Sequence, residues 1–264
     1  MIELKNASIQ FGRYTALNNC NIQVNRGEVV TLLGPNGAGK STALKALSGD
    51  IALSEGCAQI NGTDVSSYSD KELASLRAVM TQSYELMFDF LVKEVVEMAS
   101  FVHAEAFSKK QLIDFSEQAM TMTDVYELKD KNFNSLSGGQ KQRVQLARVI
   151  NQILPILDDE HAPRPYLFID EPTSSLDLYH QYEVMRIATK LAEKGVGVIA
   201  VLHDLALAAS FSDRLYLLSQ GNIVASGSSE EVLKQQQVFE TYGVRAHLQH
   251  QGGFYPSIQI AKGN

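Results

Sequence analysis

The chain has 264 residues, of which 45% are hydrophobic and 20% are charged, values that are ordinary for a water-soluble globular protein. Its net charge of −7 excludes a generic nucleic-acid binder, and two distant cysteines, Cys20 and Cys57, predict free thiols in a reducing compartment. The N-terminal residues lack the apolar core of a signal peptide. No stretch reaches the roughly 18–20 apolar residues that span a bilayer, so any work at a membrane would go through a partner.

The first quarter of the chain is expected to form strands around a glycine-rich loop. Residues 2–24 alternate apolar and polar side chains, which is the period of half-buried antiparallel strands. The continuous apolar run Val29–Leu33 predicts a strand buried on both faces, and a helix is expected over residues 41–47. The pair Asn61-Gly62 is typical of a hairpin turn.

The middle of the chain changes in character, because residues 70–150 lack proline and follow the helical period of 3.6. A helical insert is therefore expected there. The later elements are expected to be strands at 166–169 and 198–202, a helix at 178–194, a hairpin of 215–218 with 223–225, and a short helix at 230–237. Buried strands separated by a helix indicate a parallel sheet covered by helices.

Residues 34–42 read GPNGAGKST and match the phosphate-loop pattern G-x-x-x-x-G-K-[ST] between a buried strand and a helix. The glycines let successive backbone N–H groups point at phosphate oxygens, and the following helix adds the positive end of its dipole. Lys40 is expected to reach the β- and γ-phosphates, and the Ser41 hydroxyl to bind Mg²⁺. The predicted nucleotide-binding residues of this loop are Gly34, Pro35, Asn36, Gly37, Ala38, Gly39, Lys40, Ser41 and Thr42.

A second part of the site is predicted at YLFIDE, residues 166–171, where four apolar residues place Asp170 and Glu171 at the end of a buried strand. Nucleotide sites of open α/β sheets lie at such strand ends. Asp170 is predicted to hold Mg²⁺, directly or through water. Glu171 is predicted to polarise the attacking water as general base.

Residues 136–140 read LSGGQ and begin a predicted helix. Ser137 and Gln140 have the spacing of a capping box, and the two glycines between them bare backbone amides that can bind an anion. This run resembles the signature motif of ABC ATPases, and with the two motifs above the resemblance covers almost the whole chain. It implies an α/β fold of the P-loop NTPase (RecA-like) class: a parallel sheet with an antiparallel β subdomain and an inserted α-helical subdomain.

The resemblance also implies a single ABC ATPase domain, with a nucleotide-binding core at about residues 1–82 and 151–264 and a helical subdomain at about 83–150. Two such chains would pack head to tail, with each ATP between the phosphate loop of one chain and the signature motif of the other. The signature residues implied to bind nucleotide are Ser137, Gly138, Gly139 and Gln140.

Further positions match the family residue by residue. Phe11, with Tyr14 as the second choice, matches the aromatic residue that stacks on adenine. Gln82 matches the glutamine that meets Mg²⁺ and the attacking water, and His203 matches the histidine that contacts the γ-phosphate and orients the general base. The loop of residues 174–177 matches one that crosses the dimer interface. The implied catalytic residues are Glu171, His203, Gln82 and Lys40, and the implied metal-binding residues are Ser41, Gln82 and Asp170.

Residues 83–96 correspond to the surface that receives the permease in this family. Their aromatic residues Tyr84, Phe88 and Phe90 would suit a protein–protein groove or belong to the core. Three functions stay open: an importer ATPase with its transmembrane domains on a separate chain, the detached ATPase of an exporter, and a soluble ABC protein of translation or chromosome maintenance. The last predicts tandem cassettes or a long coiled coil, and the sequence contains neither.

Residues 154–163 lengthen the spacing between the signature motif and the carboxylate strand that is common in the family. The segment is polar and bounded by prolines, which predicts a surface loop. This insertion resembles the haem-import ATPases, as do residues 162–181 and the ending near Tyr242. The resemblance favours haem import across the inner membrane, with ferric siderophore or cobalamin import as alternatives.

The partners implied are a second copy of the chain, a transmembrane permease dimer and, indirectly, a periplasmic or surface substrate-binding protein, with no nucleic acid. The cofactors implied are ATP and Mg²⁺. The chain is expected to lie peripherally at the cytoplasmic face of the inner membrane. Because the transported molecule would pass through the permease, no histidine of this chain is expected to bind haem.

Overall fold

The computed structural model describes residues 1–81, 86–159, 161–173, 175–249, 251–252 and 255–261. The chain consists of two compact units: Met1–Ser67 with Gly197–Asn264, here unit 1, and Tyr68–Val196, here unit 2. Within the described residues, every helix is too short or too polar to span a lipid bilayer.

An antiparallel sheet begins unit 1. Its strands are β1 (Ile2–Phe11), β2 (Tyr14–Val24), β4 (Glu55–Ile60) and β5 (Thr63–Asp64), in the order β2-β1-β4-β5. Ile9 of β1 and Leu17 of β2 are paired across the ladder and buried, as the alternating sequence predicts. Asn61 and Gly62 make the predicted turn between β4 and β5, with φ of 54° and 82°. The short 3-10 helix η1 (Val65–Ser67) follows β5.

A mostly parallel sheet forms the second layer of unit 1. Strands β3 (Val29–Leu33) and β8 (Gly197–Val201) are parallel neighbours, β9 (Arg214–Ser219) is parallel to β3, and β10 (Asn222–Gly227) is antiparallel to β9. Every residue of β3 and β8 is buried, as their continuous apolar runs predict. Helix α1 (Lys40–Ser48) follows β3 and α7 (Leu205–Phe211) follows β8. Because β3 and β8 are parallel, the connections that follow them leave from the same edge of the sheet.

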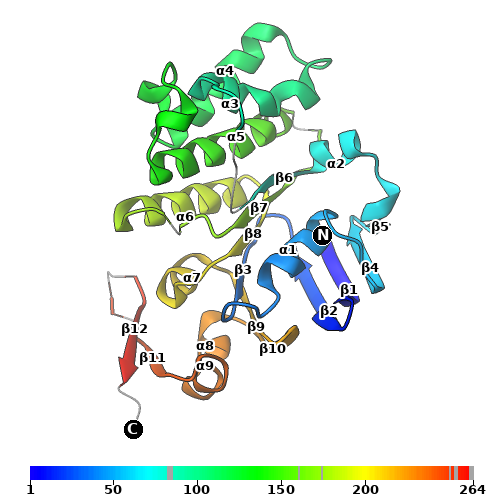
Figure 1. Ribbon diagram of the computed structural model, residues 1–264, viewed down its shortest axis with the longest axis vertical. Helices are drawn as coiled ribbons and strands as arrows, with labels where there is room; N and C mark the ends of the chain where they lie inside the picture. Colours follow the sequence, from blue (N-terminus) through cyan, green and yellow to red (C-terminus); the bar gives the residue numbers. More distant parts are fainter. Residues whose placement is uncertain (82–85, 160, 174, 250, 253–254, 262–264) are drawn as a thin grey trace. The chain divides into compact units, whose positions relative to one another are not determined.

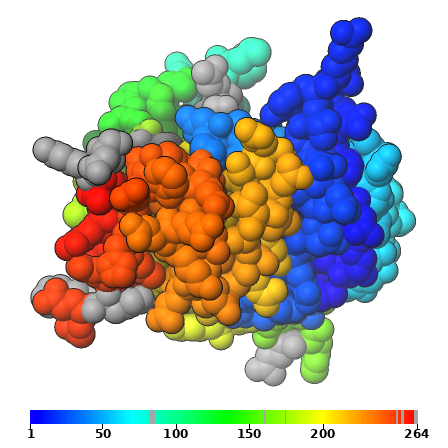
Figure 2. Space-filling model, turned by 90° about the horizontal axis from the view of Figure 1, so that it is seen from below, coloured from blue at the N-terminus to red at the C-terminus, as the bar shows by residue number. Residues whose placement is uncertain are grey.

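The C-terminal part of unit 1 contains α8 (Ser229–Val232), α9 (Gln235–Tyr242) and the hairpin of β11 (Arg245–Gln249) with β12 (Ser257–Ala261). Helix α8 contacts β9 and β10, and α9 contacts β11 (Figure 1). Figure 2 shows α8 and α9 in orange on one face, beside the hairpin of β9 and β10. The single helix predicted at 230–237 is therefore wrong in detail: the chain leaves the helical conformation at Leu233, and a second helix begins after Lys234.

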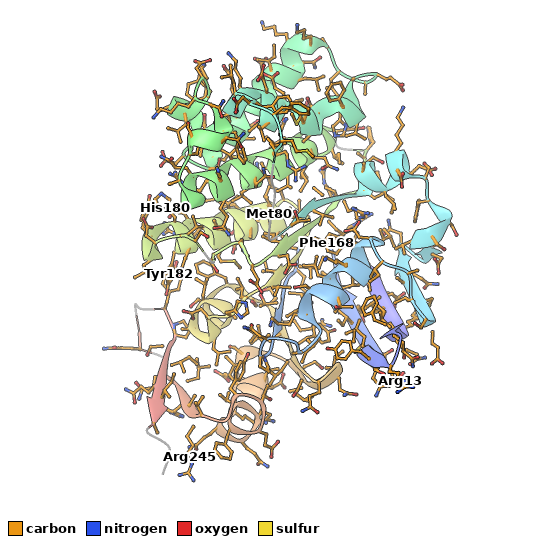
Figure 3. The ribbon with its side chains drawn as sticks, in the orientation of Figure 1. Arg13, Met80, Phe168, His180, Tyr182 and Arg245 are labelled. Atoms are coloured by element: carbon orange, nitrogen blue, oxygen red, sulfur yellow. The ribbon has the colours of Figure 1, made fainter. Side chains whose placement is uncertain are left out.

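Unit 2 is built around one long helix. Its elements are α2 (Asp70–Leu76), β6 (Arg77–Met80), α3 (Val92–Glu97), η2 (Met98–His103), α4 (Lys109–Met122), η3 (Tyr126–Leu128), η4 (Phe133–Ser135), α5 (Gly138–Asp158), β7 (Tyr166–Asp170) and α6 (Leu178–Glu193). Helix α5 contacts α2, α3, α4 and β6. Strands β6 and β7 pair in parallel, and their buried side chains Met80 and Phe168 are labelled in Figure 3. The observed α/β architecture, with parallel strands in both units, confirms the predicted fold class.

Two predictions for unit 2 need correction. Strand β6 lies within the stretch 70–150 that was predicted to be helical, because its four residues become a strand only by pairing with β7. The segment 154–163 is not a surface loop over its first half: α5 continues to Asp158 with Pro155 inside it. Leu154 and Ile156, at 4% and 8% exposure, bury apolar surface that helps the helix to pass the proline.

The core of unit 2 depends on the apolar stripe of α5. Four residues at helical spacing form this stripe and are 0–1% exposed: Leu146, Val149, Ile150 and Ile153. Asn151 is also fully buried, and its side-chain Nδ2 donates to the Val96 carbonyl at 2.9 Å and to the Ser116 hydroxyl at 3.0 Å. One amide therefore joins α5 to α3 and to α4.

The Asn151→Ala substitution is expected to lower the free energy of unfolding by about 1–3 kcal/mol, because it removes two buried hydrogen bonds that join α5 to α3 and α4. Chemical denaturation monitored by circular dichroism measures this loss. Gln236→Ala, at an exposed position of α9, is the control and should change stability by less than about 0.5 kcal/mol. Equal stability of Asn151→Ala and the wild type would contradict the structural role of this amide.

Candidate active site

The glycine-rich loop of unit 1 connects the buried strand β3 to α1. Lys40, the first residue of α1, is 5% exposed, and its Nζ donates to the carbonyls of Gly34 at 2.8 Å and Pro35 at 3.0 Å. The ammonium group therefore closes the loop on itself. The two residues at its tip, Asn36 and Gly37, are exposed.

Helix α1 begins without a side-chain cap. Its N-cap is Gly39, in the left-handed conformation with φ of 100°, and this residue has no side chain that could cap the first turn. A helix start leaves backbone N–H groups without intrahelical partners, and these groups with the helix dipole favour an anion. A Cβ at Gly39 would lie 2.6 Å from the carbonyl oxygen of Ala16 on β2, so only glycine lets the loop pass this strand.

Both candidate adenine-stacking residues lie at the β1–β2 turn. Phe11 and Tyr14 are paired across the ladder and are 52% and 57% exposed. The Tyr14 hydroxyl also donates to the Gly37 carbonyl at 3.4 Å, so this ring lies against the phosphate loop. Arg13, labelled in Figure 3, occupies the same turn.

His203 lies where its sequence position predicts, directly after β8. The backbone N–H of Leu202 donates to the Leu32 carbonyl at 3.3 Å, so the end of β8 lies beside the end of β3. His203 and the phosphate loop therefore leave the sheet at one edge. The His203 side chain is exposed, and the next residue, Asp204, caps α7 by accepting from the Leu207 N–H at 2.8 Å.

The two carboxylates of unit 2 follow the buried strand β7. Asp170 is the last strand residue and is 5% exposed, whereas Glu171 is half-buried. Glu171 has a φ of 50°, a left-handed conformation that costs a non-glycine residue about 1–3 kcal/mol unless the surroundings hold it. This strained backbone turns the chain sharply at the point where the predicted general base is placed.

The signature segment of unit 2 forms the capped helix start that its sequence predicts. Ser137 is the N-cap of α5: its hydroxyl accepts from the Gln140 N–H at 3.3 Å, while its own N–H donates to the Gln140 Oε1 at 3.0 Å. Ser137 and Gly138 are exposed. The helix start thus presents backbone amides to solvent, the arrangement that binds anionic groups.

A model of the ABC transporter family matches residues 17–174, more than half of the chain. The chain belongs to the ABC transporter family. It is 50% identical to a protein of Pseudoalteromonas translucida named hemin import ATP-binding protein HmuV, with 95% of each chain covered. A protein of the same name from Hydrogenovibrio crunogenus is 40% identical, covering 92% of this chain and 93% of its own length.

Solved structures of ABC cassettes share the fold. The dimeric cassette MJ0796, a bacterial ABC transporter cassette, is 28% identical with a TM-score of 0.76, covering 87% of this chain and 99% of that one. Its post-hydrolysis state, bound to ADP and Pi, matches with 27% identity, a TM-score of 0.75 and the same coverage. The present chain is accordingly a nucleotide-binding ATP hydrolase of the ABC type.

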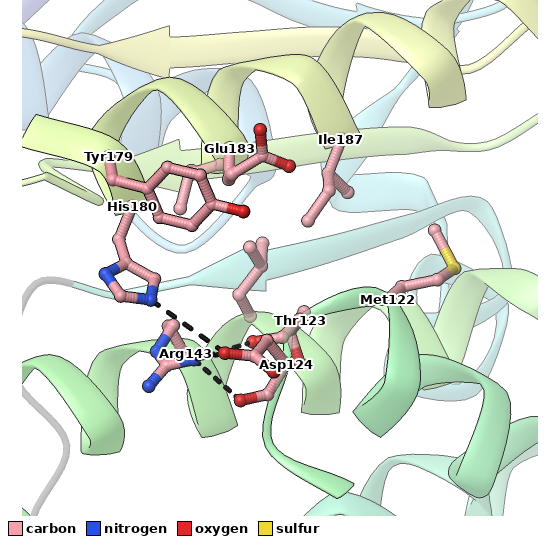
Figure 4. A pocket seen from close by; sticks show the side chains of 10 residues that line it. Met122, Thr123, Asp124, Arg143, Tyr179, His180, Glu183 and Ile187 are labelled. Carbon is pink, nitrogen blue, oxygen red and sulfur yellow. Dashed lines mark hydrogen bonds and ion pairs between the residues drawn. The ribbon is translucent and has the colours of Figure 1, made fainter.

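In this ABC cassette, a polar network lies where α4, α5 and α6 approach one another (Figure 4). Arg143 of α5 donates to the Asp124 carboxylate at 2.8 Å and to the Asp124 carbonyl at 2.6 Å, and the His180 ring on α6 lies 4.0 Å from the same carboxylate. Asp177 caps α6 by accepting from the His180 N–H at 2.9 Å. Hydrogen bonds from the backbone N–H and the ring of His180 lower the pKa of Asp177. Asp177, His180, Asp124 and Arg143 therefore connect the loop before α6 to α5.

Tyr242 of α9 is a neighbour of the phosphate loop. The sequence assigns this tyrosine no role in the nucleotide site. Burial raises the pKa of Tyr242 to about 12, and its hydroxyl lies near the backbone amide of Gly34. The phenol therefore stays neutral at physiological pH. No motif marks this residue, because its position beside Gly34 results from the packing of elements that are more than two hundred positions apart.

Three predicted positions lie outside the described residues: Gln82, Tyr84 and Ser174. Of the other aromatic residues proposed for a docking surface, Phe88 is 73% exposed and Phe90 is half-buried. Phe88 is thus available to a partner. Phe90 is held at its backbone, where its carbonyl accepts from the Phe133 N–H at 2.8 Å.

The Gly39→Ala substitution is expected to destabilise this cassette in the absence of nucleotide, because the new Cβ would meet a backbone carbonyl and the left-handed φ is unfavourable for alanine. Gly37→Ala is the matched control, since φ is 79° there and a Cβ meets no atom within 4 Å. The midpoint temperature of thermal unfolding should fall further for Gly39→Ala than for Gly37→Ala. Equal falls would mean that the approach to Ala16 does not constrain the loop.

Proposed function

We propose that this chain is the ATP-hydrolysing subunit of an ABC importer that takes up haem through a separate permease. The observation that carries the proposal is the 50% identity, over 95% of both chains, to a protein named hemin import ATP-binding protein. Further proteins of that name, from Hahella chejuensis and Vibrio vulnificus, are 43% and 39% identical over 89% and 97% of this chain.

The phosphate loop is proposed to bind the triphosphate of ATP. Its exposed tip and the uncapped start of α1 supply backbone amides for the phosphate oxygens. Lys40 would exchange its two carbonyl acceptors for the β- and γ-phosphates, with a gain in charge pairing. Phe11 or Tyr14 would stack on the adenine, and His203 would contact the γ-phosphate from the same edge of the sheet.

The residues proposed to hold Mg²⁺ are Ser41, Gln82 and Asp170. The described donors, a hydroxyl in the first turn of α1 and a buried carboxylate at the end of β7, are the oxygen ligands that Mg²⁺ prefers. When bound, Mg²⁺ would neutralise charge on the β- and γ-phosphates.

Glu171 is proposed as the general base of hydrolysis. It would accept a proton from the water whose oxygen attacks the γ-phosphorus, while the bond to the leaving ADP oxygen breaks. The signature residues Ser137 to Gln140, of which Ser137 and Gly138 are exposed, would bind the ATP held by a second copy of the chain, as in a head-to-tail dimer. Dimeric cassettes among the similar structures support this arrangement.

ATP binding would then close the dimer and draw the bound permease domains together, and hydrolysis would let the dimer reopen. A permease dimer and, through it, a substrate-binding protein would complete the importer. The chain would lie at the cytoplasmic face of the inner membrane.

The Glu171→Gln substitution is expected to lower ATP turnover about 10²- to 10⁴-fold while ATP binding persists, because the amide cannot accept the proton. Phosphate release and nucleotide binding are measured on the same preparation, and size-exclusion chromatography should show an ATP-loaded dimer. Glu193→Gln, at an exposed position of α6, is the control and should keep full activity. Wild-type turnover in Glu171→Gln would refute the assignment of the base.

Haem import predicts that the chain, reconstituted with its permease in proteoliposomes, hydrolyses ATP faster when a haem-loaded binding protein is added. The same preparation is tested with ferric siderophore-loaded and cobalamin-loaded binding proteins. Stimulation by one of these and not by haem would assign a different substrate. Export of a substrate from the interior, with no response to any binding protein, would contradict an importer.

A further inference from the structure

Gln142 lies on the first turns of α5, two residues after the signature motif, and its side chain reaches the loop that follows β7. Its Nε2 donates to the carbonyl oxygen of Glu171 at 3.0 Å, and its Oε1 accepts from the backbone N–H of Ser175 at 3.3 Å. The carbonyl on one side and the N–H on the other fix the orientation of the amide. One side chain therefore bridges the two ends of the segment 171–175.

The bridge holds the backbone at a residue in the left-handed conformation. Glu171 has a φ of 50°, which a glutamate adopts only when its surroundings fix it. A hydrogen bond to the Glu171 carbonyl restricts rotation of the peptide unit that follows this residue. The direction of the Glu171 side chain depends on this backbone, so the bond from Gln142 bears on where the carboxylate points.

The same loop is held from the other side by α6. Gln181 donates through Nε2 to the carbonyls of Thr173 at 3.3 Å and Leu176 at 3.0 Å. The two glutamines thus donate to backbone carbonyls of one loop from two different helices. Of these two side chains, Gln142 bonds to Glu171 and Gln181 does not. This difference makes Gln181 a matched comparison.

The start of α5 also packs directly against this loop. A Cβ at Gly139 would lie 3.0 Å from the Ser175 carbonyl oxygen and 3.3 Å from the Leu176 side chain, so the signature helix approaches to the distance that glycine permits. Arg143, the next residue on α5, anchors the same turn to Asp124. The signature motif and the backbone of Glu171 therefore belong to one hydrogen-bonded assembly within unit 2.

We propose that Gln142 is a positioning residue for hydrolysis: it couples the signature helix to the general base by fixing the backbone of Glu171. This inference rests on the proposed function, in which Glu171 activates water and the signature motif binds the nucleotide of the opposite subunit. A nucleotide that displaces the start of α5 pulls on the Glu171 carbonyl through a single side chain. Gln142 thereby transmits the state of the signature motif to the base in the same subunit.

Gln142→Ala removes both hydrogen bonds, and Gln142→Glu keeps an acceptor for the Ser175 N–H but replaces the donor to the Glu171 carbonyl with an oxygen. Both variants should lower kcat for ATP by about 10- to 100-fold, the cost of a misplaced catalytic group, while KM changes less than about twofold. Gln181→Ala, which leaves the Glu171 contact in place, should keep kcat within about threefold of the wild type. The assay uses the full-length chain reconstituted with its permease.

Hydrogen exchange gives a readout that does not depend on activity. In the purified full-length chain, Gln142→Ala should speed amide exchange in peptides covering residues 171–177 and leave the peptide of β3 unchanged. In a Glu171→Gln background, Gln142→Ala should produce no further loss of turnover, because both changes act through one group.

Wild-type kcat in Gln142→Ala, with Glu171→Gln inactive, would overturn this inference and leave the proposed function standing. A normal kcat in Gln142→Glu would show that Gln142 serves only Ser175, which also overturns it. A raised KM or lowered thermal stability with unchanged kcat would reveal a merely structural role. Full activity of Glu171→Gln would instead remove the general base itself, and the proposed function would fail together with the coupling.

Discussion

Backbone N–H groups at the starts of two helices are the physical feature on which this molecule depends. Helix α1 begins at a left-handed glycine without a side-chain cap, and α5 begins with exposed glycine after the capping Ser137. At both starts, the positive end of the helix dipole lies on main-chain N–H groups. A substitution of side chains does not remove these groups. Backbone N–H groups can bind a polyphosphate only if the loop that carries them keeps one conformation. The rest of each unit holds its loop in that conformation.

Buried strands supply the fixed shape. In unit 1, β3 and β8 are buried along their whole length and deliver the phosphate loop and His203 to one edge. In unit 2, the equally buried β7 delivers Asp170 and Glu171. Apolar burial holds these strands in the core, whereas Asn36, His203 and Glu171, which follow them in the chain, are polar and at least partly exposed. The boundary between the two environments is where the chemistry is proposed to occur.

Helix α5 connects several parts of unit 2 along its length. Its first residues present the signature amides, Gln142 and Arg143 tie it to loops before and after it, and its middle is anchored in the core by Asn151. Pro155 is accommodated near its end because the neighbouring side chains remain buried. A displacement at the signature end would therefore act on the hydrogen bond from Gln142 to the Glu171 backbone.

The sequence by itself determined the local features: the phosphate loop, the carboxylate strand, the capping box of Ser137 with Gln140, and the order of most strands and helices. These follow from residue types at fixed short spacings, which act within one turn or one strand. Strand β6, the path of the chain through Pro155, the neighbourhood of Tyr242 and Gly34, and the bridge made by Gln142 were decided only by the tertiary structure. Each of these arises where segments distant in sequence meet, and a strand pairing, a buried proline or a long-range hydrogen bond leaves no periodic signal in the residues that make it.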